Sequence, residues 1–396
     1  MRVLSVTAQK PCSTGSGVYL TEVVRSLAKM GVSQAVVAGV TREDRVDMPE
    51  GVTVYPVYFS SEKLPYPVVG MSDEMPYTST RYRDMTEEMA GQFKAAFLEV
   101  LDEAIEKENP DIILCHHLYY LTALIRAHYP AKKVYGFCHN TDLRQMESIL
   151  FERNFIRQEI PKLDRIFALQ EAQKEKIKKI YPVSEKQMTV IGTGYNSEVF
   201  KKTGIKSSRK DGKIRMIFAG KITQKKGVKS LLRALNLLDY EKEKIQLILA
   251  GGAGNLVEYE EIKELADGCR YPVVFAGCVT QSRLAELYND CDIFVLPSMY
   301  EGLPLTVIES LACGDRVVMT KLEGIAEWLA DMVPDADIRY VLPPGMKGTD
   351  EPLEEELPAF ESRLAEALRE AIEEKDTKEC DVSRISWKKI AREVIR

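Results

Sequence analysis

Residues 297–314 read PSMYEGLPLTVIESLACG, and this segment decides the fold class of its half of the chain. The apolar run Cys291–Leu296 precedes it and has the length and β-branched content of a buried strand. A loop with glycine and proline follows, and an apolar-periodic segment, Leu305–Cys313, then ends at Gly314, a common helix terminator. The segment therefore predicts a strand, a loop and a helix of a parallel α/β domain.

Two glutamates, Glu301 in the loop and Glu309 on the helix, bracket this unit. A carboxylate on an otherwise apolar helix must be paired or must hold a ligand, because burying a lone charge is costly. Glu301 falls at the carboxyl end of the predicted strand, where open α/β sheets bind ligands. Taken alone, such a pair is more typical of helix-capping or solvated carboxylates, so the neighbouring segments decide between the two interpretations.

Upstream of this unit the alternation of strands and helices continues, which predicts a second parallel α/β domain. The strands are expected at Ile214–Ala219, Ile245–Ala250 and Val273–Ala276, and the helices at Val228–Leu238, Glu258–Asp267 and Gln281–Asn289. The loop Gly220–Gly227 (GKITQKKG) offers cations and backbone amides to a phosphate, although a solvated basic turn accounts for it equally well. A Gly-rich turn, Gly251–Gly254, follows the next strand.

The first half of the chain opens in the same way. A strand pattern, Arg2–Ala8, leads through a small-residue loop to a helix pattern, Val18–Met30, and a further strand, Gln34–Gly39. The glycines at Gly15 and Gly17 let the backbone approach a ligand where a helix N-terminus can receive an anion. A simple tight turn is the commoner use of such a loop.

Three histidines follow two buried strand patterns of this first domain. His116 and His117 come after Asp111–Cys115, and His139 comes after Val134–Cys138. Ligand-facing loops gather at this edge of a parallel sheet, which makes a binding role about as good an interpretation as core or surface histidines.

Two further segments of the first domain are candidates for contact with an acceptor or a surface. Residues 56–83 hold four prolines and many aromatics without a clear period, which is typical of an ordered, contact-making loop. The charged pattern Arg144–Lys162 predicts one amphipathic helix. Its arginines at 144, 153 and 157 are compatible with a phosphate, a membrane surface or only solvent.

Composition places the domain boundaries. The basic segment 201–213 (KKTGIKSSRKDGK) is almost devoid of apolar groups and predicts a linker between a first domain, 1–200, and a second, 214–378. Residues 379–396 are expected to form a final helix around Trp387 that packs back on the first domain.

Length, charge and cysteine usage narrow the class of protein. A chain of 396 residues with a net charge of −6 fits about two globular domains and gives no electrostatic support for binding nucleic acid. The eight cysteines form no CxxC pair, which indicates buried thiols of a reducing cytosol rather than zinc or disulfide sites. Without a signal peptide or a long apolar run, the sequence predicts a cytoplasmic protein and leaves peripheral contact with the inner membrane face open.

Taken together, these segments resemble retaining, nucleotide-sugar-dependent glycosyltransferases of the GT-B fold, in particular glycosyltransferase family 4 (glycosyl transferases group 1). Glu301 and Glu309 fit the E-x7-E motif of that family, and Gly220, Lys221, Lys226 and Gly227 fit its G-[RK]-x4-K-G loop. The resemblance covers essentially the whole chain, with the strongest match over residues 214–328 and the weakest over 56–83.

The resemblance implies two Rossmann-like domains that face across a cleft, and a role for each matching residue. The catalytic residues would be His139, Glu301 and Lys226. The donor-binding residues would be Gly15, Gly17, Lys221, Lys226, Gly252, Glu301, Gly302, Leu303, Leu305, Thr306 and Glu309. Acceptor contacts would fall to His116, Asp142 and Arg144.

The implied reaction moves a sugar from a nucleoside-diphosphate donor to a hydroxyl acceptor with retention of the anomeric configuration. UDP is the expected nucleotide of the donor. The reaction needs no enzyme nucleophile, cofactor or metal, and the DxD-like Asp290 and Asp292 stand at the start of a buried strand. The chain departs from the family at Lys221, where arginine is usual, and at Asp315-Arg316, where proline is common. A nucleotide-sugar sensor or scaffold without transferase activity, or a GT-B epimerase, is the alternative function.

Overall fold

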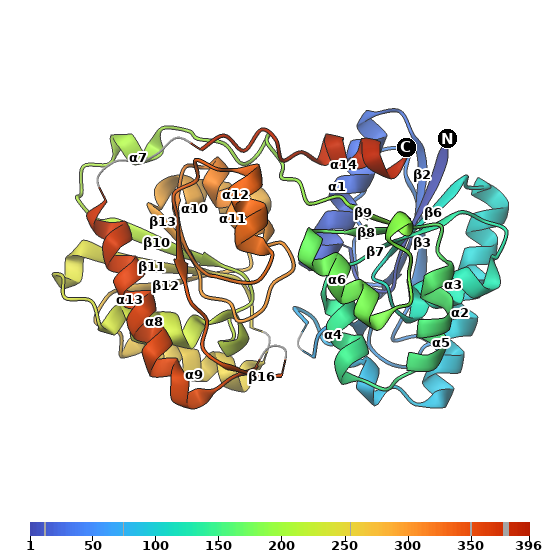
Figure 1. Ribbon diagram of the computed structural model, residues 1–396, viewed down its shortest axis with the longest axis horizontal. Helices are drawn as coiled ribbons and strands as arrows, with labels where there is room; N and C mark the ends of the chain where they lie inside the picture. Colours follow the sequence, from blue (N-terminus) through green and yellow to red (C-terminus); the bar gives the residue numbers. More distant parts are fainter. Residues whose placement is uncertain (12, 74, 254, 349–350, 375–379) are drawn as a thin grey trace. The chain divides into compact units, whose positions relative to one another are not determined.

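The computed structural model describes residues 1–396 except 12, 74, 254, 349–350 and 375–379. The chain forms two compact units (Figure 1). The first unit comprises Met1–Gly194 and Ser386–Arg396, and the second comprises Tyr195–Ile385. Each unit is organised around its own parallel sheet.

The first unit contains a seven-stranded parallel sheet in the order β3-β2-β1-β6-β7-β8-β9. Its strands are β1 (Arg2–Thr7), β2 (Ser33–Val40), β3 (Thr53–Tyr58), β6 (Ile112–His116), β7 (Val134–Phe137), β8 (Arg165–Ala168) and β9 (Met188–Val190). Its helices are α1 (Gly15–Lys29), α2 (Glu87–Glu108), α3 (Tyr120–His128), α4 (Thr141–Ser148), α5 (Arg153–Glu159), α6 (Glu171–Ile180) and α14 (Trp387–Val394). The inner strands are buried along almost their whole length, as the continuous apolar runs of a parallel sheet require.

The second unit contains a six-stranded parallel sheet in the order β12-β11-β10-β13-β14-β15. Its strands are β10 (Ile214–Ala219), β11 (Ile245–Ala250), β12 (Val273–Gly277), β13 (Ile293–Leu296), β14 (Arg316–Thr320) and β15 (Ile338–Val341). Its helices are α7 (Ile205–Ser208), α8 (Val228–Asn236), α9 (Leu256–Asp267), α10 (Gln281–Asp290), α11 (Leu305–Ala312), α12 (Ile325–Met332) and α13 (Leu357–Glu373). A short antiparallel pair, β16 (Met346–Lys347) and β17 (Glu351–Pro352), precedes α13. The predicted α/β class with parallel sheets is confirmed.

The strand order in both sheets reverses next to the first strand of the unit. Strand β1 lies between β2 and β6, and strand β10 lies between β11 and β13. At such a reversal the connections leave in opposite directions, and the carboxyl ends of the strands border the usual ligand crevice of an open α/β sheet. The loops after these strands carry most of the predicted site residues. Within each unit, the predicted site residues therefore lie at one edge of the sheet.

The described residues of the Pro-rich segment 56–83 contribute in part to the first sheet. Its first residues belong to β3, where Pro56 pairs with Ala38 on an edge strand that tolerates a missing N–H donor. Further along, the two-residue strands β4 (Val69–Gly70) and β5 (Thr80–Arg81) pair in parallel. The sequence did not predict these strands, because proline lowers the strand signal.

The prediction of one helix over Arg144–Lys162 is wrong. Helix α4 ends where Ile149 becomes extended, and α5 starts only after Glu152, which has φ +47°. The Arg153 side chain donates to the backbone carbonyl oxygens of Ile149 (3.1 Å) and Glu147 (3.1 Å) at the end of α4. Arg153 therefore satisfies carbonyls that the break leaves open, and it does not belong to a basic face on a continuous helix.

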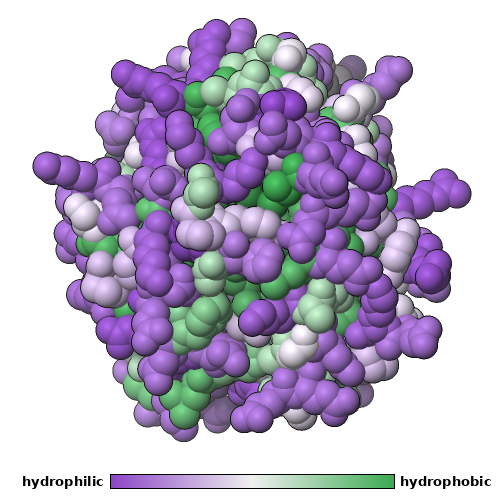
Figure 2. Space-filling view, turned by 90° about the vertical axis from the view of Figure 1, so that its right-hand side faces the viewer, coloured by the Kyte–Doolittle hydropathy of each residue, from purple (hydrophilic) through white to green (hydrophobic). Residues whose placement is uncertain are grey.

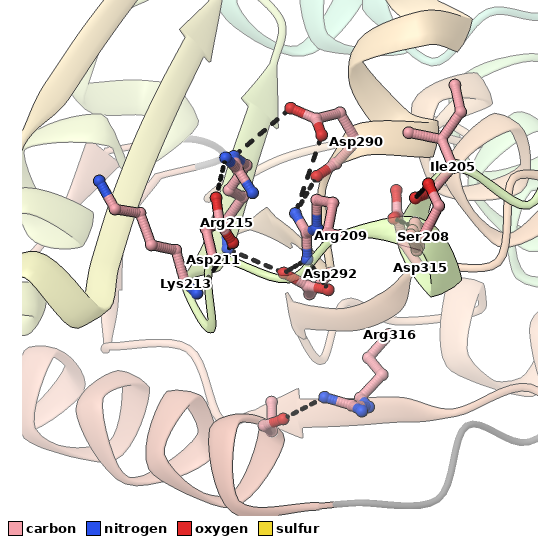
Figure 3. A network of polar contacts seen from close by, with 12 residues as sticks. Ile205, Ser208, Arg209, Asp211, Lys213, Arg215, Asp290, Asp292, Asp315 and Arg316 are labelled. Atoms are coloured by element: carbon pink, nitrogen blue, oxygen red, sulfur yellow. Dashed lines mark hydrogen bonds and ion pairs between the residues drawn. The ribbon is translucent and has the colours of Figure 1, made fainter.

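The predicted linker 201–213 is instead fastened to the second unit, to which Tyr195–Ile385 belongs as a whole. Arg209 donates to both carboxylate oxygens of Asp292 (2.5 and 2.6 Å) and to the carbonyl oxygen of Asp290 (Figure 3). Lys206 on α7 pairs with Asp315 and donates to the carbonyl oxygen of Cys313 at 3.2 Å. Two of the basic side chains that suggested a solvated linker, Lys206 and Arg209, thus have acidic partners far along the chain.

The first unit also includes the end of the chain. Residues 387, 390, 391 and 394 of α14 are buried at helical spacing and pack against α1. The Trp387 ring meets Tyr19 edge to face with centroids 4.9 Å apart, and its backbone and ring leave no room for a side chain at Gly194. The predicted boundary at 378/379 lies outside the described residues, and the first boundary between the units falls at Gly194 rather than at residue 200.

The described surface exposes some large apolar side chains, such as Leu150 and Leu256. No helix within the described ranges is long and apolar enough to cross a membrane. Hydrophilic residues predominate on the face that Figure 2 shows, with hydrophobic residues in separated patches. Of the cysteines, Cys278 is exposed, which corrects the expectation of buried thiols at that position, and Cys12 lies outside the described residues.

We expect Trp387→Ala to destabilise the first unit by about 3–5 kcal/mol, because it empties a packed site between α1 and the 192–194 segment. Thermal unfolding followed by circular dichroism measures the effect. The matched control is Lys388→Ala on the exposed side of the same helix, which should leave the transition within experimental scatter. Equal transitions for both variants would contradict the packing role.

The buried Asp315 should make stability depend on pH. Burial raises the pKa of its carboxyl from 3.8 to about 7, while Lys206 opposes the shift. Between these values the folded state binds more protons than the unfolded state, so the free energy of unfolding falls as pH rises, by at most about 1.4 kcal/mol per pH unit. We expect Asp315→Asn to flatten this slope in urea unfolding at pH 5 and pH 7.

The control for this experiment is Asp211→Asn. That carboxyl is exposed and pairs with Arg215 at 2.6 Å, and this partner lowers its pKa instead of raising it. The control should therefore retain the slope. A variant at Asp315 with an unchanged slope would show that another group titrates.

Candidate functional site

The second unit places the basic loop of residues 220–227 directly after β10. Thr223 accepts a hydrogen bond from the Lys226 amide at 3.4 Å, which closes a single turn over Gln224–Lys226. Gly227 then has φ +74° and is the N-cap residue of α8. The turn gives Lys226 a defined position at the carboxyl edge of the sheet.

The close approach of Gly227 to the loop after β13 joins two predicted segments. A Cβ atom at Gly227 would lie 2.1 Å from the carbonyl oxygen of Pro297, so only glycine fits. Next to this contact the Met299 amide donates to the carbonyl oxygen of Lys225 at 3.0 Å. Backbone contacts alone therefore set the spacing between the lysine loop and the glutamate loop.

Lys226 and Glu301 meet as a result of this spacing. The Lys226 ammonium donates to the Glu301 carboxylate at 2.6 Å, and both side chains are mostly buried, with 26% and 13% of their surface exposed. A pair with this degree of burial holds its geometry better than a surface ion pair. The structure thus brings together the lysine and the first glutamate that the sequence predicted in separate segments.

Glu309 lies inside α11, and 6% of its surface is exposed. The helix starts after Pro304 and buries Val307, Ile308 and Leu311, and Gly314 at φ +82° follows its end. The predicted donor contacts Gly302 and Leu303 lie in the loop before the helix, and Leu305 and Thr306 form its first turn.

The predicted Gly251–Gly254 turn leaves β11 beside this site. The Gly251 backbone packs so closely on Gly220 that a Cβ atom would lie 1.7 Å from the Gly220 carbonyl oxygen. The Ile222 amide donates to the carbonyl oxygen of Gly252 at 3.0 Å. These contacts align the turn with the Lys221 side of the basic loop, and Gly254 lies outside the described residues.

In the first unit the predicted glycine loop is the first turn of α1. Thr14 caps the helix by accepting from the Gly17 amide at 3.1 Å, so the helix begins at Gly15 and not at Val18 as the sequence suggested. Because glycine is a poor helix former, the sequence pattern did not indicate this first helical turn. The placement keeps Gly15 and Gly17 at a helix N-terminus at the carboxyl edge of β1.

The three predicted histidines gather where β6 and β7 end. His116 Nδ1 and His139 Nε2 lie 3.1 Å apart, and the two rings are nearly parallel at 12°. His117, directly after β6, and Asn140, three residues after β7, have φ of +76° and +72°. Such left-handed backbone at two neighbouring strand ends is typical of functional sites, where packing holds it in place.

Burial keeps these histidines neutral. It lowers the pKa of His116 to about 3 and that of His139 well below 6.5, and the neighbouring imidazoles lower both further. For His117 burial also lowers the pKa, with Asp142 acting in the opposite direction. The sequence predicted the shared edge but gave no signal for the contact between the rings.

The predicted acceptor contacts are placed in supporting positions. His116 is only 4% exposed, and Asp142 is fully buried and accepts from the backbone amides of Leu118 (2.7 Å) and His139 (3.3 Å). Arg144 is buried and pairs with Asp73 at 3.0 Å. These contacts hold the strand-end loops and the 56–83 segment in place, and contact of these residues with an acceptor stays a prediction.

No metal site emerges from the described ranges, in which no group of three or more His, Cys, Asp or Glu side chains could hold an ion. The DxD-like pair has another role. Asp292 binds Arg209, and Asp290 lies 3.4 Å from the Arg215 guanidinium (Figure 3). Both carboxylates stand at the amino-terminal end of β13, away from the edge that carries Glu301.

Comparison with known proteins identifies the family. Residues 13–199 match the sequence model described as Glycosyltransferase Family 4, and residues 200–379 match the one described as Glycosyl transferases group 1. The chain belongs to these glycosyltransferases. The predicted resemblance to family 4 is therefore confirmed.

Curated relatives match this chain over part of its length. An uncharacterized glycosyltransferase from Methanocaldococcus jannaschii is 29% identical over 41% of this chain and 44% of its own length. The alpha-maltose-1-phosphate synthase of Mycobacterium tuberculosis is 26% identical over 45% of this chain and 46% of its own length. The chain thus spans about half the length of the curated relatives that it matches.

Solved structures share the fold of this chain. Sucrose-phosphate synthase from Thermosynechococcus elongatus superimposes with a TM-score of 0.70 at 15% identity, over 100% of this chain and 97% of that one. HepE from Anabaena, in complex with UDP and glucose, gives a TM-score of 0.63 at 15% identity over 100% and 98%. The predicted GT-B architecture of two Rossmann-like domains is confirmed.

We expect Gly227→Ala to destabilise the second unit by about 2–5 kcal/mol, because a side chain there adds backbone strain to a collision with the Pro297 carbonyl. Thermal unfolding gives the shift. The matched control is Gly212→Ala, which has a similar φ of +65° but no atom within 4 Å of the added Cβ, and it should show the strain alone. Similar losses for the two variants would show that the collision is relieved at no cost.

Proposed function

We propose that this protein transfers a sugar from a nucleoside-diphosphate sugar, with UDP as the nucleotide, to a hydroxyl acceptor with retention of anomeric configuration. The contact between Lys226 and Glu301 carries this proposal, because a cation suited to a diphosphate and a carboxylate suited to sugar hydroxyls meet there at one sheet edge. Family membership supports the reaction type. The UDP and UDP-glucose bound by HepE support the choice of donor.

The groups around the leaving diphosphate are expected to contribute most to the rate of this reaction. As the bond between the anomeric carbon and the phosphate oxygen breaks, negative charge grows on that oxygen. A cation at this point stabilises the transition state more than the ground state, so Lys226 should contribute mainly to kcat. Lys221 offers a second positive charge in the same loop, as a point charge without the fork of an arginine.

The acceptor oxygen attacks the anomeric carbon from the face that the diphosphate leaves, which gives retention. Its proton passes to the departing phosphate oxygen, so the step needs neither an enzyme nucleophile nor a metal ion. Glu309 would accept from the ribose hydroxyls and Glu301 from hydroxyls of the donor sugar, while His139 would lie near that sugar. The buried state of Glu309 fits a carboxylate that binds hydroxyls in place of solvent.

The ion pair gives Glu301 a second task in this scheme. Its carboxylate holds the Lys226 ammonium at 2.6 Å, so the lysine side chain is ordered before the donor arrives. An ordered cation costs less conformational entropy on binding than a free lysine side chain. Glu301 thereby links sugar recognition to the charge that receives the diphosphate.

We expect Lys226→Met to lower kcat for donor turnover by about 10²–10³-fold, with a smaller change in KM, because the lost charge acts mainly in the transition state. The measurement is release of nucleotide from UDP-sugars with candidate acceptors, in buffer that contains EDTA. The matched control is Lys229→Met on α8, whose ammonium pairs with Glu261 and should matter little.

Glu309→Gln tests the nucleotide contact in the same assay and by calorimetry with UDP. Weaker UDP binding in this variant, together with slow turnover by Lys226→Met, is the expected pattern. UDP-sugar binding by the wild type without turnover on any acceptor would instead favour a sensor or scaffold. Wild-type rates in both variants would refute the proposed site.

A further inference from the structure

The imidazoles at the ends of β6 and β7 do not only share a location but also contact each other directly. His116 Nδ1 lies 3.1 Å from His139 Nε2, which is hydrogen-bond distance. A bond between two ring nitrogens requires one proton in the contact, because one nitrogen must donate and the other accept. The contact therefore couples the protonation of the two rings.

Neither ring is cationic near neutral pH. Burial lowers the pKa of His116 to about 3 and that of His139 well below its usual value. A neutral imidazole carries one N–H and one acceptor nitrogen. If His116 donates from Nδ1, then His139 accepts at Nε2 and holds its own proton on Nδ1. If His139 donates from Nε2, then His116 holds its proton on Nε2.

Both arrangements give the two histidines the same tautomer, and no arrangement with opposite tautomers keeps the hydrogen bond. We propose that His116 is a positioning residue that sets the tautomer of His139, and thereby decides whether His139 Nδ1 offers a donor or an acceptor to the donor sugar. The tautomer coupling rests on the geometry alone. Its catalytic consequence rests on the proposed function.

The surrounding residues keep the two rings in register. Phe137 stacks on His116 with centroids 4.8 Å apart and an interplanar angle of 16°. Tyr19 meets His139 edge to face at 5.2 Å, and its own hydroxyl donates to the carbonyl oxygen of Gly192 at 3.1 Å. The His139 amide is held by Asp142. Side chains fixed on both sides favour a persistent hydrogen bond between the rings.

The far side of His116 can stabilise either tautomer. The ring borders a cavity of about 10 Å³, which is close to the space that one water needs. His116 Nε2 and the Tyr119 hydroxyl are buried and have no hydrogen-bond partner among the described residues, and both residues line the cavity. A water in this cavity could donate to His116 Nε2 or accept from it, so this side of the ring is compatible with both tautomers.

The direct test is nitrogen-15 NMR of the imidazoles at neutral pH. The chain has four histidines, so single substitutions assign every ring. We expect His116 and His139 to report the same neutral tautomer in the wild-type protein. Opposite tautomers in the folded wild type would overturn the proposal, whatever the enzymatic activity proves to be.

Substitutions at His116 test the positioning role. His116→Phe keeps a ring to stack on Phe137 but removes both nitrogens, so His139 should lose its single tautomer and kcat should fall by about tenfold or more. His116→Asn returns an amide near the position of Nδ1 and should restore both properties in part. The matched control is His128→Phe at the exposed end of α3, which should change neither.

These outcomes separate the inference from the proposed function. An unchanged His139 spectrum in folded His116→Phe would refute the positioning role. If that variant does not fold, the wild-type spectrum and His116→Asn still decide the question. Coupled tautomers without transferase activity on any acceptor would support the pair and refute only the proposed reaction.

Discussion

The site in the second unit depends on one close approach, that of the Gly227 backbone to the Pro297 carbonyl. Strands β10 and β13 are neighbours, but neighbouring strands alone do not determine how their loops meet. A side chain at residue 227 would separate the loops and remove the hydrogen bond from Met299 to Lys225. Without that spacing the Lys226 ammonium would not reach Glu301, so a steric constraint on backbone sets an electrostatic contact between side chains.

The sequence predicts best where one local signal is enough. Strands β10 and β11 have the predicted bounds, because a short continuous apolar run that stops at a glycine is typical of a buried parallel strand. Helix α1 begins earlier than predicted because glycines in its first turn imitate a loop, and Pro56 hides the edge strand β3. The single helix expected over 144–162 fails for a different reason, since the break at Glu152 is a backbone conformation that no residue type there demands.

In the candidate site, too, some features could be predicted from the sequence and others could not. Each strand end that carries a predicted residue lies within one residue of the predicted position, and parallel topology brings these ends to one edge of the sheet. The pairing of His116 with His139 and of Lys226 with Glu301 depends on side-chain geometry between segments far apart in sequence, which a pattern does not encode. Asp142 illustrates the difference: its position beside His139 was predicted, whereas its use as a buried acceptor for two backbone amides was not.

A side-chain contact between distant segments also explains how the chain accommodates Asp315, where the family commonly has proline. An aspartate there would be an unpaired buried charge unless a cation reached it, and Lys206 from the segment 201–213 does so. The same ammonium donates to the carbonyl oxygen of Cys313, where the C-terminal end of a helix favours a positive charge. That helix is α11, which carries Glu309, so the segment with a linker-like composition is fastened to the helix that presents the predicted nucleotide contact.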